Sequence, residues 1–272
     1  MARIEIRRAL PTAHDAAAFA RVERTTLGDS DLSPQEMLLV LRRAEQYVYL
    51  AMADDRAVGV LATCETGAQG GIRLELDMLG VLTAWRNMGI AGSLVAAALH
   101  DGRSRGCTSF RAVVAADNLA SQKVMARAGL ETSASGQSLL TQVFADDPAS
   151  LQLPRGWTVR LVADLAQSAP ENRDWALPGH WGLYLSDESG REVAAAALLP
   201  VQTMACASCW IEKLVVRDPE AGQILFRAAA VAAQRRGRDE IGVLLPRDSA
   251  PEAAALAAGY QSGGVYHILM GS

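Results

Sequence analysis

A short turn rich in small residues is the feature of this sequence most suited to binding chemistry. Residues 83–94 read TAWRNMGIAGSL, in which Arg86 precedes Gly89 and Ala91 at the start of an apolar, helix-forming run. Small residues let backbone N–H groups approach a ligand closely, and the first turn of a helix adds partial positive charge. An arginine supplies a full charge. This combination predicts a site for a phosphorylated ligand such as a diphosphate.

Two common nucleotide-binding motifs do not describe this turn. The Gly-x-Gly start of a dinucleotide-binding motif is absent, and no Gly-Lys-Ser/Thr follows, as a Walker loop requires. An ordinary glycine turn before an amphipathic helix would also give the pattern Arg-x-x-Gly-x-Ala. The flanking sequence is needed to separate these interpretations.

Two segments in succession resemble the motifs of the GNAT superfamily of N-acetyltransferases. LGVLTAWRNMGIAGSL, residues 79–94, is similar to the coenzyme-A motif of that family, and DNLASQKVMARAGLE, residues 117–131, is similar to the motif that follows it. The resemblance extends over residues 3–144. The positions that match one by one are Arg86, Gly89, Ala91, Asn118, Ser121 and Gly129.

The resemblance implies acetyl-CoA as co-substrate. No metal is expected, because the one closely spaced cysteine pair, Cys206 and Cys209, has neither a second pair nor a nearby histidine at ligand spacing. It assigns the pantetheine arm to Leu79, Gly80 and Val81, between two strands that separate, with the Val81 N–H as donor to the developing oxyanion. The remaining coenzyme-binding residues that it implies are Arg86, Asn87, Met88, Gly89, Ile90, Ala91, Gly92, Asn118 and Ser121.

Acetyl transfer to an amine needs a proton acceptor, because an alkylammonium with a pKa of about 10 has no free lone pair at neutral pH. Glu75 and Asp77 lie two apart on a predicted strand and so face one side. Glu75 stands where several GNAT enzymes carry their general base, so we expect Glu75 to be the base, with Asp77 assisting. The alternative, that Arg73, Glu75 and Asp77 form the solvated stripe of an edge strand, stays open.

A general acid is not assigned. Many members of the GNAT superfamily have a tyrosine in the helix of the second motif, and Met125 stands at that position here. This departure leaves open a second function, a non-catalytic sensor or subunit that binds acyl-CoA.

The periodicity of the first half predicts an α/β (α+β) domain with a mixed, mostly antiparallel sheet flanked by helices. Alternation predicts strands at 4–8, 47–53, 57–64, 72–82, 108–115 and 138–144. Helical spacing predicts helices at 13–24, 33–45, 90–106 and 118–128.

The second half repeats the first. Arg56 and Arg191 are 135 residues apart, whereas Leu94 and Leu225 are 131 apart, so four residues are missing from the second copy. Two domains are therefore expected, at residues 1–146 and 155–272.

The deletion removes the turn that would hold a pyrophosphate and leaves Asp218 and Glu220 there, whose charges would repel it. We expect a degenerate GNAT-like domain that does not bind acetyl-CoA. Such a copy could wall the acceptor site or offer the surface of a homodimer. Glu212 is the repeat equivalent of Asp77.

Composition narrows the class of partner. The 272 residues are 50% hydrophobic and carry a net charge of −4, which excludes a disordered chain and gives no field to attract nucleic acid or a membrane. No signal peptide or membrane-spanning run is apparent, so a cytoplasmic location is expected. Together with the resemblance, which implies the reaction, this leads us to expect an acetyl-CoA-dependent N-acetyltransferase in which the primary amine of a small molecule or peptide attacks the thioester directly.

Overall fold

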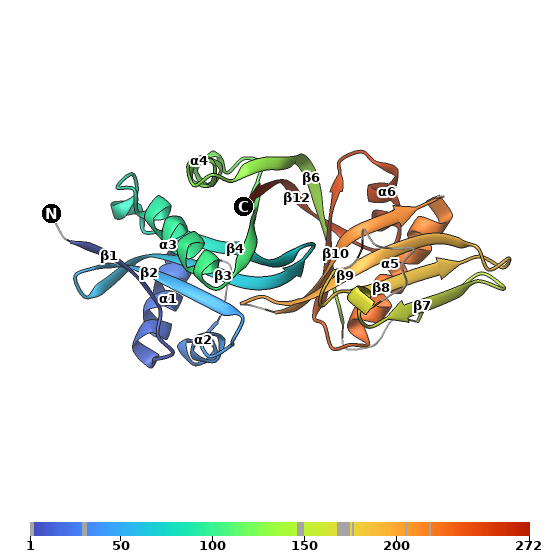
Figure 1. Ribbon diagram of the computed structural model, residues 1–272, viewed down its shortest axis with the longest axis horizontal. Helices are drawn as coiled ribbons and strands as arrows, with labels where there is room; N and C mark the ends of the chain where they lie inside the picture. Colours follow the sequence, from blue (N-terminus) through green and yellow to red (C-terminus); the bar gives the residue numbers. More distant parts are fainter. Residues whose placement is uncertain are drawn as a thin grey trace.

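The computed structural model describes residues 3–28, 32–145, 150–167, 175, 177–204, 206–217 and 219–272. Twelve strands form one sheet in the order β1-β2-β3-β4-β5-β12-β6-β11-β10-β9-β8-β7 (Figure 1). The strands of the first half are β1 (Ile4–Arg8), β2 (Gln46–Ala53), β3 (Arg56–Ala68), β4 (Gly71–Val81), β5 (Cys107–Ala115) and β6 (Glu131–Val143). Those of the second half are β7 (Thr158–Val162), β8 (Trp181–Ser186), β9 (Glu192–Gln202), β10 (Ala207–Val216), β11 (Glu240–Pro246) and β12 (Gln261–Gly271).

The helices follow the same repeat. The first half contains α1 (Ala13–Thr26), α2 (Pro34–Val40), α3 (Ile90–Ser104) and α4 (Leu119–Arg127), and the second contains α5 (Pro219–Gln234) and α6 (Ala250–Ala257). The expected mixed α/β class is confirmed. We call β1–β5 with α1–α4 the first lobe, and β7–β11 with α5 and α6 the second lobe.

The two lobes exchange their last strands. β12, the end of the chain, pairs with β5 of the first lobe, and β6 pairs with β11 of the second. β6 and β12 also pair with each other at the centre of the sheet. Figure 1 shows the C-terminus lying in the first lobe, where Arg103 donates to the Ser272 carbonyl at 2.9 Å. Each lobe therefore depends on the other for a strand of its sheet.

Both faces of the first-lobe sheet are covered, because β2 is buried along its whole length. Leu50 packs with Phe19 and Met37, from α1 and α2, on one face. Tyr49 packs with Leu94, from α3, on the other. Figure 1 shows α3 lying across the strands of this lobe. In the second lobe α5 and α6 cover one face, and a small cluster around Leu165 and Tyr184 covers the other. Burial on both faces fixes the register of these strands.

The largest errors among the predicted boundaries are at the end of one helix and the start of one strand. The predicted helix 33–45 ends at Val40, because Arg43 and Gln46 turn aside to donate to the Thr203 and Gln202 carbonyls of the second lobe. The predicted strand 138–144 begins already at Glu131. Its small polar residues hide the alternation, but backbone partners in β11 and β12 hold it extended.

Candidate active site

Strand β4 leaves its neighbour β5 partway along its length. The two strands are parallel and pair only as far as Leu76, whereas β4 stays paired with β3 as far as Val81. The Leu82 N–H donates to the Val58 carbonyl at 2.9 Å, so alternation points the N–H and C=O groups of Val81 away from β3. The predicted pantetheine segment, residues 79–81, thus borders a gap between two strands.

The turn at the end of β4 presents backbone donors to open space. Gly89 is the N-cap of α3 with a φ of 78°, and no side chain caps the helix there. A Cβ added at Gly89 or Gly92 would meet no atom within 4 Å. Free amides at an unobstructed helix N-terminus form an anion site. The exposed Arg86 lies at the same opening, and its Nε donates to the Val81 carbonyl at 3.1 Å.

The other residues assigned to the coenzyme lie around this turn. Asn87 and Met88 are exposed within it, and Ile90, Ala91 and Gly92 form the first turn of α3. Asn118 caps α4 and accepts from the Ser121 N–H at 3.0 Å. The structure therefore brings the residues of the first motif together at the open end of the gap.

The second lobe lacks the equivalent turn. Eight residues, 82–89, connect β4 to α3, but two, 217–218, connect β10 to α5. Asp218 lies outside the described residues. Pro219 opens α5 without an N–H, and Glu220 adds negative charge to the first turn. These features favour the prediction that the second copy does not bind acetyl-CoA.

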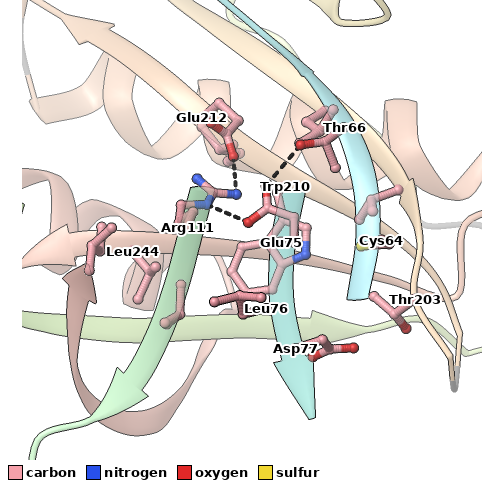
Figure 2. Close-up of a pocket in the computed structure, with 15 residues that line it drawn as sticks. Cys64, Thr66, Glu75, Leu76, Asp77, Arg111, Thr203, Trp210, Glu212 and Leu244 are labelled. Carbon is pink, nitrogen blue, oxygen red and sulfur yellow. Dashed lines mark hydrogen bonds and ion pairs between the residues drawn. The ribbon is translucent and has the colours of Figure 1, made fainter. Parts of the chain in front are cut away.

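A cavity of about 190 Å³ lies between the two lobes and is bordered by β4 where it leaves β5 (Figure 2). Glu75, Asp77 and Arg111 reach it from the first lobe, and Trp210 and Glu212 from the second. A single buried water needs roughly 10–15 Å³. The space is thus large enough for a small ligand group.

Four charged side chains form a closed network, and three of them, Glu75, Arg111 and Glu212, line the cavity. Glu75 accepts from Arg73 Nε at 2.6 Å and from Arg111 Nε at 2.8 Å, and Thr66 Oγ1 also donates to it at 2.8 Å. Glu212 accepts from the same arginines, at 3.1 Å from Arg73 and 2.7 Å from Arg111. The oxygens of Glu75 are therefore held by cations.

Burial alone would raise the pKa of Glu212, but the charges of Arg111 and Arg73 outweigh it and lower this pKa to about 2. The network thus contains two arginines and two carboxylates that are closely paired. Its charges balance, and it presents no free cation to the cavity.

Asp77 lies outside this network. Asp77 and Met78 together oppose the single residue Ala62 of β3, so a β-bulge sits at this point of β4. The Asp77 carboxylate makes no hydrogen bond or ion pair with any residue in the described part of the chain. The side chain is exposed and lines the cavity. Although the carboxylate stays accessible from the cavity, the protein around it reduces its hydration, and this desolvation together with the Glu75 charge raises the pKa of Asp77 to about 6.

The role of Glu75 in the network can be tested through stability. We expect Glu75→Gln to lower the free energy of unfolding by about 3 kcal/mol, because it leaves buried arginine charge uncompensated. Urea unfolding at pH 7 measures this, with Glu131→Gln, an exposed position, as control. Equal stability of the two variants would contradict the structural role.

Trp210 and the two arginines of the network were not predicted from the sequence. The repeat offset of 135 places Trp210 opposite Glu75, and this equivalence was the one signal available. Arg111 is paired with Glu75 in the parallel register of β4 and β5, which only the fold reveals. Met125, at the expected tyrosine position, is buried in the core beneath α3 and α4.

Comparison with known proteins defines the class of protein. Residues 13–130 match the acetyltransferase (GNAT) family. The first lobe therefore contains a match to the GNAT acetyltransferase domain, and this match supports acetyl transfer from an acyl-CoA. A search of curated proteins found no match.

Solved structures share the tandem fold over the full length. A GCN5-related N-acetyltransferase from Sphaerobacter thermophilus is 18% identical, with a TM-score of 0.57 over 97% of this chain and 95% of that one. A tandem GNAT protein from the clavulanic acid biosynthesis pathway is 14% identical, with a TM-score of 0.54 over 98% of both chains. The chain thus has the two-lobed fold of tandem GNAT proteins.

Among the described residues, no helix is long and apolar enough to cross a membrane. No group of three or more His, Cys, Asp or Glu side chains in the described ranges is placed to hold a metal ion.

Proposed function

We propose that this chain transfers the acetyl group of acetyl-CoA to a primary amine of a small molecule or peptide, and that Asp77 accepts the proton of the amine. The observation that carries the proposal is the unpaired Asp77 carboxylate, set by a β-bulge on the wall of a cavity where β4 leaves β5. The sequence favoured Glu75 as the base, with Asp77 assisting. The contacts of Glu75 support the reverse assignment.

Residues of the first lobe fit the co-substrate. The uncapped N-terminus of α3, with the open space at Gly89 and Gly92, suits the pyrophosphate. The gap beside residues 79–81 suits the pantetheine arm. When bound, acetyl-CoA supplies the acetyl group as a thioester. The Val81 N–H faces the gap and would donate to the carbonyl oxygen as negative charge develops there.

Asp77 suits proton transfer better than Glu75 does. A general base works best when its pKa lies near the working pH and its oxygens are free to approach the proton. The pKa of Asp77 is raised to about 6, first by the reduced hydration of its carboxylate in the cavity and then by the Glu75 charge. Glu75, whose oxygens accept from Arg73, Arg111 and Thr66, would hold the cavity wall in place.

At the usual position of the general-acid tyrosine the chain has Met125, whose side chain is buried in the core. A thiol has an ordinary pKa of about 8.5, so the coenzyme can leave as a thiolate and take its proton from water. Met125 is also the feature that favours the second candidate, a non-catalytic sensor or subunit that binds acyl-CoA. Release of free thiol from acetyl-CoA in the presence of a panel of amines distinguishes the two.

The pH profile of the reaction should report Asp77. Below its pKa the carboxyl group is protonated and cannot accept a proton, so we expect kcat/KM to fall about tenfold per pH unit below about pH 6. Initial rates of thiol release from roughly pH 5 to pH 8, which spans the range over which the group titrates, measure this. A profile that stays flat through pH 6 would contradict the assignment.

A further inference from the structure

The cavity between the lobes is built from equivalent parts of each lobe. β4 carries a β-bulge at Asp77 and Met78, and β10 carries one at Glu212, between Ile211 and Lys213. These bulges are 135 residues apart, the offset of the repeat. Asp77 and Glu212 are thus corresponding carboxylates that reach one cavity from opposite lobes (Figure 2).

The surroundings of these two carboxylates differ in charge. Glu212 is neutralised by Arg73 and Arg111 of the first lobe. In the second lobe the corresponding positions are Ser208 and Gly242, as the repeat offset and the β4–β5 and β10–β11 registers show. Neither residue is cationic. No cationic side chain among the described residues therefore pairs with Asp77.

Trp210 occupies the space that the missing arginine leaves. A Cβ at Gly242 would lie 2.9 to 3.1 Å from three atoms of the Trp210 ring, so the ring rests directly on the glycine. The indole is half-buried and borders the same cavity as Asp77 (Figure 2). Its Nε1–H has no hydrogen-bond partner in the described ranges. The second lobe thus offers an aromatic surface where the first lobe offers a charge.

We propose that the second lobe selects the acceptor, which is a primary amine with a single positive charge and a flat, uncharged body, bound with its ammonium at Asp77 and its body against Trp210. This inference rests on the proposed function and specifies its substrate class. Apolar side chains of Leu199 and Leu244 complete the wall on the second-lobe side and suit an uncharged body.

Charge balance excludes two other classes of amine. An amino acid would bring a carboxylate, but Arg111, the arginine on the described cavity wall, is already paired with Glu75 and Glu212. A polyamine would bring additional cations, but Asp77 is the one uncompensated carboxylate on the described cavity wall. In either case a charge would lose water without gaining a partner, which is costly.

Calorimetric titration of the full chain saturated with free coenzyme A tests this, because binding is then measured without turnover. The probes are 2-phenylethylamine, phenylalaninol, phenylalanine, spermidine and ethylamine. We expect 2-phenylethylamine and phenylalaninol to bind at least tenfold more tightly than phenylalanine and spermidine. Phenylalaninol carries a branch at the same carbon as phenylalanine without its charge, so it controls for shape.

Variants separate the contributions of Trp210 and Asp77 to the affinity for the amine. Trp210→Ala should weaken the binding of 2-phenylethylamine at least tenfold. It should change the affinity for ethylamine, which lacks a flat body, less than threefold. Trp210→Phe, which keeps a ring, should restore most of the affinity. Asp77→Asn should weaken both amines. Thermal unfolding of each variant shows whether the fold is intact, and the ratio between the two amines separates selection from a general loss of structure.

Several results would overturn this inference: no binding by any probe, equal binding of phenylalanine, or the same loss for both amines in Trp210→Ala. Thiol release from acetyl-CoA is assayed separately on the same proteins. Turnover that does not depend on Trp210 would reject the acceptor assignment alone, whereas coenzyme binding without turnover for any amine would reject the proposed function.

Discussion

Replacing Asp77 with asparagine should lower kcat at least a hundredfold while leaving the affinity for acetyl-CoA within a factor of about two. The amide has nearly the same shape but cannot accept a proton, and general base catalysis contributes about 10² to 10⁴-fold. The residues predicted to bind the pyrophosphate lie in the turn before α3, apart from the cavity wall that carries Asp77. Thiol release gives kcat, and calorimetry gives the affinity for the coenzyme.

Stability provides a control for this variant. The pKa of Asp77 is raised in the folded protein, so its ionised form costs stability at every pH above the ordinary pKa of an aspartate. Asp77→Asn removes that charge and should raise the unfolding temperature at pH 7, or leave it unchanged. Loss of activity with a lower unfolding temperature would point to a folding defect. Activity retained to within threefold would remove Asp77 from the mechanism.

Introducing a negative charge at Gly92 should weaken acetyl-CoA binding at least tenfold. Gly92 lies in the first turn of α3, and its Cβ position borders open space, so a glutamate can be accommodated there. Its carboxylate would compete with the pyrophosphate for the free amides and repel it. An acidic residue in the first turn favours the helix dipole, so Gly92→Glu should not destabilise the fold.

Two matched variants accompany this measurement. Gly92→Ala adds only a methyl group to the same open space and should keep the affinity of the parent protein. Glu220→Gln changes charge at the start of α5 in the second lobe and should also leave binding unchanged, since the binding turn is expected in the first lobe alone. Unaltered affinity in Gly92→Glu, or altered affinity in Glu220→Gln, would mean that the coenzyme binds elsewhere.

The local features of this protein could be predicted from its sequence. The turn at Arg86 and Gly89 depends on residue types at neighbouring positions. The internal repeat is visible because the same residue types recur at a nearly constant offset. The short connection before α5 follows from the same comparison of the two copies. Glu75 and Asp77 were expected on one side of a strand, and both line the same cavity.

The choice between these two carboxylates depends on residues distant in sequence. Arg111, from the neighbouring strand, and Arg73 pair with Glu75, and Glu212 of the other lobe pairs with the same two arginines, so that Asp77 is left free. Periodicity records whether a side chain faces in or out, but not which charges meet it. The base could therefore not be identified before the fold was known.

The exchange of β6 and β12 was likewise decided by the tertiary structure. The two copies have corresponding last strands, so the pattern of either strand fits the edge of either lobe. Pairing β12 with β5 and β6 with β11 joins both sheets into one and brings Trp210 to the same cavity as Asp77. Sequence determined the strands and the binding turn, because these arise from neighbouring residues. Tertiary structure decided which strands and charges meet, because backbone hydrogen bonds and ion pairs join residues without regard to their distance along the chain.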